Sequence, residues 1–562
     1  MTSNIELKPI NNILNKYHIS DDKIKNYGKY IAKLNVDNLK TRDKVGKLVL
    51  VTSISPTIYG EGKTTTVIGL VDSLNKIDRD AVAILREPSL GPVFGTKGGA
   101  TGGGLAKVVP ESEINLQFTG DMSAVNNANN LLCAIVDNHI FQGNELNIKD
   151  VVFPRTIEVN DRALRNITIN SSYKREEHFI LTVASELMAC LCLASDFKEL
   201  KEMVKKIIVA YNKDDKPIFV EDLKATDAIC ILLKEAISPN VVQTLEHNLA
   251  LIHGGPFANI AHGTASIRAI KTGLNNFSYS VVEAGFGSDL GAEKFLDIVC
   301  PKGKFYPDLI IINATIRALK YNGDGSLEEG LSNLQAHIDN MHLFSDNILV
   351  SLNKFNDDSK EDISLIEKLC QKNKVSFAVN DTYSKGSTGG IELAREVVKL
   401  CDKEKTITKL YADDKKIEEK IEILAKKIYH AKEVSYTSIA LEKIKHLENL
   451  HLDKYPICVS KTPMSISDNK ELLGYPKDYT IHITDIRLNN GAGFIVVYMG
   501  NVITLPGLSK NSNYLNMHID DDGNIVDEVD VTVEKDVKKA NILDYILRNL
   551  IVLGKGKSLL KQ

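Results

Sequence analysis

A glycine-containing segment between a predicted strand and a predicted helix has the composition of a phosphate-binding loop. The apolar run 48–51 precedes it, and a helical pattern begins at its Gly-Lys-Thr end. Backbone N–H groups at a helix N-terminus point at an anion, Lys63 supplies a mobile positive charge, and the Thr64 hydroxyl can reach a bound Mg²⁺. We therefore predict that a nucleoside triphosphate is bound by Thr57, Ile58, Tyr59, Gly60, Glu61, Gly62, Lys63 and Thr64, with Thr64 as the metal ligand.

This segment is a variant of the P-loop pattern G-x-x-x-x-G-K-[ST]. Thr57 stands where the first glycine belongs, and the loop carries Gly60 and Gly62 instead. The alternative interpretation is a glycine-rich turn with a solvated lysine. The preceding strand, the Gly-Lys-Thr triplet and the following helix all favour phosphate binding.

The overall composition is that of an ordinary globular chain. It has 562 residues, of which 43% are hydrophobic and 25% charged, enough to bury a large core divided among several domains. The net charge of -4 offers no global basic surface, so we expect small substrates and no nucleic-acid partner.

Neither targeting nor metal-cysteine signals are evident in the chain. The N-terminal residues lack the apolar core of a signal peptide, and no later apolar run approaches the roughly 18 residues of a membrane span. We therefore expect a cytoplasmic protein without a membrane partner. The eight cysteines form no paired CxxC set and are expected to be buried thiols.

Apolar runs that alternate with helical patterns predict an α/β fold with a parallel, doubly wound sheet as a P-loop NTPase core, to which smaller α/β domains are attached. The runs used for this prediction are 82–85, 207–210, 309–312 and 348–352. Arg86 follows the first of them, where loops at the carboxyl ends of strands gather around ligands, and is placed to bind an anion. The predicted domains are a nucleotide-binding and catalytic core 1–350, an α/β domain 351–455 and a smaller C-terminal α/β domain 456–562.

Three other segments have distinctive patterns. Six glycines in Gly95–Gly104 predict a loop, and we favour a ligand loop over a flexible linker. Residues 415–449 are rich in Lys, Glu, Ile and Leu at helical spacing, which predicts exposed helices over the core. Alternation over 480–487, followed by a second apolar run at 490–498, predicts the strands of the C-terminal unit.

Several motifs together resemble formate tetrahydrofolate ligase, also called 10-formyltetrahydrofolate synthetase. The resemblance covers nearly the whole chain and includes the P-loop. Its other motifs are Arg86-Glu-Pro-Ser-Leu-Gly91 with the glycine segment up to Gly104, Phe118-Thr-Gly-Asp121, His253–Gly263, Glu283–Lys294, Ala314–Lys320, Gly491–Phe494 and Leu505–Leu508.

The resemblance implies a two-step ligation. Formate attacks the γ-phosphate of ATP to give formyl phosphate, and N10 of tetrahydrofolate then attacks the formyl carbon and expels phosphate. It further implies Mg²⁺, activation by a monovalent cation such as K⁺ or NH₄⁺, and a homotetramer.

The resemblance and the residue chemistry together give three predicted catalytic residues, which are Lys63, Arg86 and Asp121. The guanidinium of Arg86 suits a carboxylate or an acyl phosphate, and its alternative role is a structural ion pair. Asp121 could orient the attacking amine or take up its proton, and its alternative role is a helix N-cap.

Glu87 is either a ligand of the reacting groups or a buried partner of Arg86. His253 and His262 are expected to serve packing or backbone hydrogen bonding.

For the folate, the resemblance carries over Phe355 and Tyr383 as the two aromatic walls of the pterin site. The family usually has tryptophan where Tyr383 stands, and the chain contains no tryptophan. Other departures from the family pattern are Leu105, Gln117, Ser123, Pro463 and Met464. We therefore hypothesise that ATP and formate use is retained and that the folate preference is altered, toward dihydrofolate or another folate form.

Two alternatives belong to other functional classes. One is a nucleotide-binding regulatory protein without ligase chemistry, against which the retained Lys63, Arg86 and Asp121 argue. The other is a P-loop partition or metal-chaperone ATPase, which only the variant loop suggests.

Overall fold

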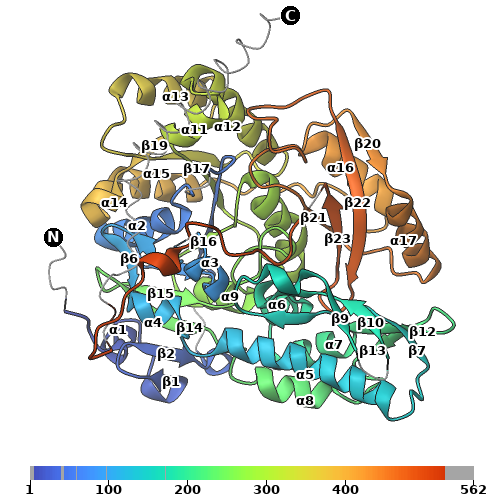
Figure 1. Cartoon of the computed structure of the whole chain (residues 1–562). Coiled ribbons are helices and arrows are strands. Elements are labelled where there is room, and N and C mark those ends of the chain that lie inside the picture. Colours follow the sequence, from blue (N-terminus) through green and yellow to red (C-terminus); the bar gives the residue numbers. More distant parts are fainter. Residues whose placement is uncertain are drawn as a thin grey trace, which may run out of the picture.

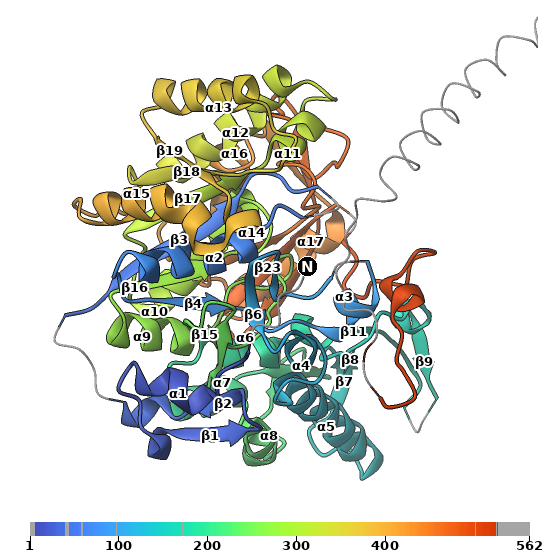
Figure 2. The same ribbon diagram turned by 90° about the vertical axis from the view of Figure 1, so that its left-hand side faces the viewer.

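The computed structural model describes residues 6–39, 44–57, 60–96, 98–170, 173–500, 502–523 and 525. A 12-stranded sheet runs through the molecule, from β1 at the bottom of Figures 1 and 2 toward β19 near the top. In spatial order its main strands are β1 Ile24–Tyr27, β2 Ile31–Leu34, β14 Asn240–Thr244, β15 Leu249–Ile252, β4 Ala81–Leu85, β16 Tyr279–Glu283, β3 Lys47–Ser53, β17 Leu309–Ala314, β18 Ile348–Asn353 and β19 Ser376–Asn380.

The seven strands from β15 to β19 in this order are all parallel, whereas β1, β2 and β14 extend the sheet by antiparallel pairing. The large, mostly parallel α/β sheet that the sequence predicts is thus confirmed. Two short strands continue from β14, namely β6 Ala106–Val109, which pairs with β14, and β5 Gly102–Gly103, which pairs with β6. The predicted glycine loop therefore contains one two-residue strand.

Helices cover both faces of the sheet because successive strand residues point to opposite sides. Leu48 and Leu50 of β3 belong to one apolar cluster, with α9 Ile267–Asn276 and α12 Leu327–His342. Val49 and Val51 belong to a second cluster, with α2 Lys63–Lys76 and α15 Ile391–Cys401. The remaining helices around this sheet are α1 Ile10–Asn15, α3 Leu90–Phe94, α4 Glu111–Asn115, α10 Cys300–Gly303, α11 Ile316–Asn322, α13 Lys360–Lys372 and α14 Thr382–Lys385.

The predicted strand at 207–210 lies outside the parallel sheet, so its assignment to that core was wrong. It forms β12 Ile208–Asn212, which pairs antiparallel with β13 Pro217–Phe219 and β7 Ile148–Val151. A short apolar run indicates a buried strand, and the first three residues of β12 are indeed buried. Such a run does not indicate which other strands will pair with it.

The region around this small sheet contains helices and short strand pairs. The helices are α5 Asp121–Phe141, α6 Glu186–Leu193, α7 Phe197–Lys205 and α8 Thr226–Leu233. The strand pairs are β8 Arg155–Ile157 with β11 Phe179–Leu181, and β9 Ile167–Ile169 with β10 Arg175–Glu177.

A four-stranded sheet lies at the right of Figure 1, beside β7 and β12. Its order is β20 Glu433–Tyr436, β22 Thr480–Asn489, β23 Phe494–Met499 and β21 Ile457–Ser460. The helices predicted within 415–449 are α16 Ile417–Lys427 and α17 Ser438–Asn449, and they pack on this sheet. Among the described residues, no helix is long and apolar enough to cross a membrane.

Candidate active site

The P-loop segment connects the carboxyl end of β3 to the N-terminus of α2. Gly62 precedes the helix with φ +69°, and a Cβ atom there would lie 2.4 Å from Nδ2 of Asn353. A side chain is therefore excluded both by the left-handed backbone and by the close approach of β18. The predicted strand, glycine loop and helix are all present.

Lys63 and Thr64 are the first two residues of α2, and both are partly exposed. The Lys63 Nζ atom donates to Oγ of Ser53 at 3.1 Å, and the Thr64 hydroxyl donates to Oε2 of Glu283 at 2.7 Å. Glu283 ends β16, the strand next to β3, so neighbouring strands bring its carboxylate to the start of α2.

The Glu61 side chain stabilises the loop through hydrogen bonds. Its buried carboxylate accepts hydrogen bonds from the Thr57 backbone N–H at 2.7 Å and from the Thr315 hydroxyl at 2.5 Å. Gly60 is exposed, and its carbonyl accepts a hydrogen bond from Arg317 at 3.3 Å. The predicted ligands Ile58 and Tyr59 lie outside the described residues.

Arg86 follows β4 and faces the same carboxylate as Thr64. Its Nε atom lies 3.7 Å from Oε1 of Glu283, and its Nη1 atom donates to the Pro256 carbonyl at 3.5 Å. The Arg86 side chain is 24% exposed, whereas that of Glu283 is 4% exposed. The ion pair considered for Arg86 is thus present, with Glu283 as the partner, and the Arg86 side chain stays partly exposed.

Asp121 lies in a buried polar cluster. It is the first residue of α5 and follows the N-cap Gly120, so the alternative role as N-cap does not apply. Its Oδ1 and Oδ2 atoms lie 2.7 Å and 2.8 Å from Nζ of Lys33, and Nδ2 of Asn240 donates to Oδ2 at 2.8 Å. Lys33 and Asp121 are each 2% exposed. Burial raises the pKa of Asp121, and the Lys33 charge opposes that rise.

Glu87 lies near this cluster and is not an ion-pair partner of Arg86 within the described part of the chain. Burial raises the pKa of Glu87 well above its usual value, and the negative charge of Asp121 raises it further. Its Oε2 atom has no hydrogen-bond partner among the described residues.

The oxygen atoms at the start of α2 fit a hard divalent cation. The Thr64 hydroxyl and the Glu283 carboxylate already meet at 2.7 Å, and oxygen donors of these types are preferred by Mg²⁺. These two residues would hold the metal that the sequence predicts, together with phosphate oxygens of a bound nucleotide. Glu283 was not among the residues predicted for this site.

A family model described as formate–tetrahydrofolate ligase matches residues 1–527. The chain belongs to this family. A protein from Caldicellulosiruptor saccharolyticus with that name is 48% identical over 543 residues, which cover 93% of this chain and 98% of the relative. A protein of the same name from Pediococcus pentosaceus is 48% identical over 544 residues, with the same two coverages. The resemblance drawn from the motifs is confirmed.

The two aromatic residues that the family resemblance assigns to the folate follow neighbouring parallel strands, β18 and β19. Phe355 is 36% exposed and Tyr383 is 48% exposed, so each presents a face to solvent. The guanidinium of Arg317 lies 4.9 Å from the centroid of the Phe355 ring. Tyr383 packs on the glycine segment, where a Cβ atom at Gly103 would lie 3.0 Å from its ring.

Among the departures from the family pattern, Leu105 lies beside Tyr383. Its backbone N–H donates to the Tyr383 carbonyl at 2.9 Å, and its side chain is exposed. Gln117 is exposed, and Ser123 accepts a weak hydrogen bond from Asn127 at 3.4 Å. Leu105 and Tyr383 are therefore two departures from the family pattern that lie side by side.

The two histidines have different environments. Both ring nitrogens of His253 are hydrogen-bonded, to the Ser266 hydroxyl at 2.6 Å and to the Ala236 carbonyl at 2.7 Å, which agrees with the structural role expected for it. His262 is fully buried, and neither ring nitrogen has a hydrogen-bond partner among the described residues. Burial lowers the pKa of each to about 3, so both rings are neutral.

Sequence reasoning missed Lys33 and Asn240, which hold Asp121. One signal was available, because Lys33 is the single charged residue in the strand Ile31-Ala-Lys-Leu34, which is buried at every position. A lysine is almost never fully buried without a partner, so a buried strand that contains one predicts a carboxylate nearby.

Proposed function

We propose that this protein ligates formate to N10 of tetrahydrofolate at the expense of ATP, giving 10-formyltetrahydrofolate, ADP and phosphate through formyl phosphate. Family membership supports the ligation itself. The observation that carries the ATP-dependent mechanism is the linkage of Thr64 and Arg86 through the single carboxylate of Glu283, directly beside Lys63.

In the first step, a formate oxygen attacks the γ-phosphorus and ADP leaves. The reaction needs positioning and charge neutralisation more than covalent help. Lys63 and the backbone amides at the start of α2 neutralise the phosphate oxygens, while the exposed part of Arg86 holds formate or the acyl phosphate.

Bound at Thr64 and Glu283, Mg²⁺ would neutralise negative charge on the phosphates. For the monovalent cation, K⁺ or NH₄⁺, the unpartnered Oε2 atom of Glu87 is an oxygen of suitable type. A cation there would offset the repulsion between Glu87 and Asp121, which Lys33 offsets only in part.

In the second step, N10 attacks the formyl carbon and phosphate leaves with one of the original formate oxygens. The amine must lose a proton, and we assign its uptake to Asp121, whose pKa is raised toward that of a useful base. Lys33 and Asn240 position this carboxylate.

Phe355 and Tyr383 are proposed to stack against the pterin, with Tyr383 giving a smaller wall than tryptophan. This difference motivates the proposal of an altered folate preference, which includes dihydrofolate. A homotetramer and a cytoplasmic location are also proposed, from the family resemblance and from the sequence respectively.

The test is to incubate the protein with ATP, Mg²⁺, K⁺ and formate, adding tetrahydrofolate or dihydrofolate in parallel, and to quantify ADP and formylated folate by chromatography. We expect equal amounts of ADP and 10-formyltetrahydrofolate. Preference for dihydrofolate would assign the change at Tyr383 to specificity. If neither folate is formylated and ADP formation does not depend on formate, the ligase proposal fails and a regulatory role is favoured.

A further inference from the structure

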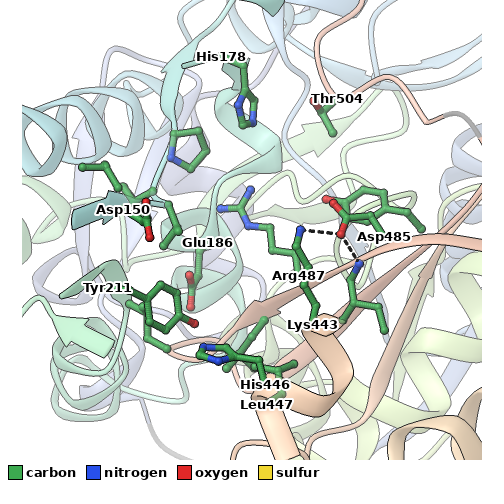
Figure 3. Close-up of a pocket in the computed structure, with 18 of the residues that line it drawn as sticks. Asp150, His178, Glu186, Tyr211, Lys443, His446, Leu447, Asp485, Arg487 and Thr504 are labelled. Atoms are coloured by element: carbon green, nitrogen blue, oxygen red, sulfur yellow. Dashed lines mark hydrogen bonds and ion pairs between the residues drawn. The ribbon is translucent and has the colours of Figure 1, made fainter. Parts of the chain in front are cut away.

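A cavity of about 850 Å³ lies between the three-stranded sheet β13-β12-β7 and the C-terminal four-stranded sheet (Figure 3). Figure 1 shows these sheets at the right of the molecule, whereas α2 and α14 lie at the left. The described residues that line the cavity include none of those predicted to be catalytic or nucleotide-binding. Its volume lies within the range of about 300–1,000 Å³ that is typical of small-molecule sites.

Arg487 of β22 reaches into this cavity between His178 and Glu186 (Figure 3). No carboxylate among the described residues lies within 4.0 Å of its guanidinium. Burial raises the pKa of the nearby Tyr498 hydroxyl, and the charge of Arg487 opposes that rise. The nearby Lys443 is different, because it pairs with Asp485 at 2.6 Å. The planar donor group of Arg487 is therefore available to a ligand carboxylate.

Glu186 is the buried acidic group of the cavity wall. It is 3% exposed and begins α6, and its Oε1 atom accepts hydrogen bonds from the backbone N–H groups of Gly491 at 2.7 Å and Ala492 at 3.4 Å. The described residues offer no ion pair to this carboxyl group and no hydrogen bond to its Oε2 atom. Burial raises the pKa of Glu186 to about 7, and the more distant charge of Arg487 opposes that rise.

The rest of the wall is apolar and aromatic. Tyr211 and His446 meet edge to face with ring centroids 5.2 Å apart, and Ile208, Leu447 and Leu488 lie around them. Besides Glu186, five other carboxylates line the cavity, and four of them pair with basic side chains: Asp485 with Lys443, Glu177 with Arg155 and Arg175, and Asp150 and Asp215 with Lys149. Arg487 and Glu186 form no ion pair among the described residues, and these two opposite charges suit a zwitterion better than a polyanion or a simple cation.

We propose that this cavity binds an α-amino acid with a large apolar side chain. The ligand carboxylate pairs with Arg487, its ammonium group lies at Oε2 of Glu186, and its side chain packs against Tyr211, His446 and Leu447. A bound zwitterion of this kind would contact both Arg487 and Glu186, and its side chain would bury apolar surface at the same time.

Isothermal titration calorimetry on the full chain tests this proposal with L-phenylalanine and L-leucine. Two analogues isolate the charges, since 3-phenylpropionate lacks the ammonium group and 2-phenylethylamine lacks the carboxylate. We expect saturable binding of at least one amino acid, and binding of each analogue weaker by about tenfold or more, because each loses one charge-assisted contact. No saturable binding of either amino acid, or equal binding of 2-phenylethylamine and L-phenylalanine, would overturn the proposal.

Two variants locate the site. Arg487→Gln should weaken binding of the amino acid by about tenfold or more. Glu186→Gln keeps a carbonyl acceptor for Gly491 and should selectively reduce the advantage of the amino acid over 3-phenylpropionate. Arg395→Gln, at an exposed arginine on α15 that pairs with Glu392, is the matched control and should bind as the unmodified chain does. Thermal unfolding establishes that each variant is folded, and unchanged binding by a folded Arg487→Gln variant would contradict the assignment. Because the readout is binding alone, the result is independent of the ligase proposal.

Discussion

Two lysines, Lys63 and Lys33, show how differently the two halves of the candidate active site are built. Lys63 is the first residue of α2, is partly exposed, and donates to the Ser53 hydroxyl at 3.1 Å. Lys33 lies within β2, is 2% exposed, and is held between both oxygens of Asp121. In the proposed mechanism the first moves to an incoming phosphate, whereas the second stays paired with a protein carboxylate. The same residue type would then serve ligand binding in one region and positioning in the other.

The largest effect is expected at the buried pair. Lys33→Met would remove the ion-pair partner of the buried Asp121 carboxylate, and we expect a loss of about 3–5 kcal/mol in the free energy of unfolding. Urea denaturation measures it. Lys385→Met is the control, because that lysine pairs with Asp381 at the surface and should cost at most about 1 kcal/mol. Equal losses in the two variants would contradict a structural role for Lys33 that differs from that of a surface lysine.

Lys63→Met should lower activity and leave stability unchanged, in contrast to the stability loss expected for Lys33→Met. We expect ligase activity to fall by on the order of 10³-fold because the charge that neutralises the phosphates is lost. The urea midpoint should stay close to that of the unmodified chain, since Lys63 is partly exposed and lies at the first position of α2. A variant that keeps its activity, or that loses activity only through unfolding, would remove Lys63 from the phosphate site.

Arg86→Lys tests whether the guanidinium does more than pair with Glu283. Lysine preserves the charge but not the planar pair of donors, so we expect kcat to fall by on the order of 10²-fold. Steady-state kinetics with formate as the varied substrate measures it, with Arg395→Lys as an exposed control. Full activity in Arg86→Lys would mean that the ion pair with Glu283 is its whole function.

Tyr383→Trp restores the aromatic residue that the family usually has at this position. We expect KM for tetrahydrofolate to fall by about two- to twelvefold, since a larger stacking surface adds about 0.5–1.5 kcal/mol. KM for ATP should not change. If the variant alters ATP kinetics and leaves folate kinetics as they were, Tyr383 does not contact the pterin.

The pH profile gives the finest test of the buried cluster. Asn240 donates to Asp121 and lowers its pKa, while burial raises it above the ordinary value of 3.8. Asn240→Leu removes the stabilisation of the charged form, so the pKa of Asp121 rises further. Because a base must be deprotonated to act, the acidic limb of the kcat profile should move to higher pH. An unmoved acidic limb would show that Asp121 does not take up the proton in the rate-limiting step.

The strand, loop and helix around Lys63 could be predicted because their sequence pattern is contiguous. The residues Gly62, Lys63 and Thr64 follow one another, and the strand before them and the helix after them are local patterns. The Asp121 cluster could not be assembled in this way, because Lys33 and Asn240 are 88 and 119 residues away from Asp121 along the chain. Their meeting depends on the antiparallel pairing of β2 and β14, which no local pattern specifies.

The order of strands in the sheets also could not be predicted from local sequence patterns. Residues 309–312 and 348–352 lie in the parallel sheet as predicted, whereas the similar apolar run at 207–210 joined a separate antiparallel sheet. Glu283 was overlooked for a related reason. Its position beside Thr64 and Arg86 depends on β16 lying between β3 and β4, an order that the sequence does not show.

The most direct test of the mechanism is the fate of the formate oxygens. The protein is incubated with [¹⁸O₂]formate, ATP, Mg²⁺, K⁺ and tetrahydrofolate, and the released phosphate is analysed by mass spectrometry. Attack of formate on the γ-phosphorus predicts one ¹⁸O atom in the phosphate for each formylated folate, and Lys63→Met should suppress both products together. Formylated folate accompanied by phosphate without ¹⁸O would contradict a formyl phosphate intermediate at this P-loop.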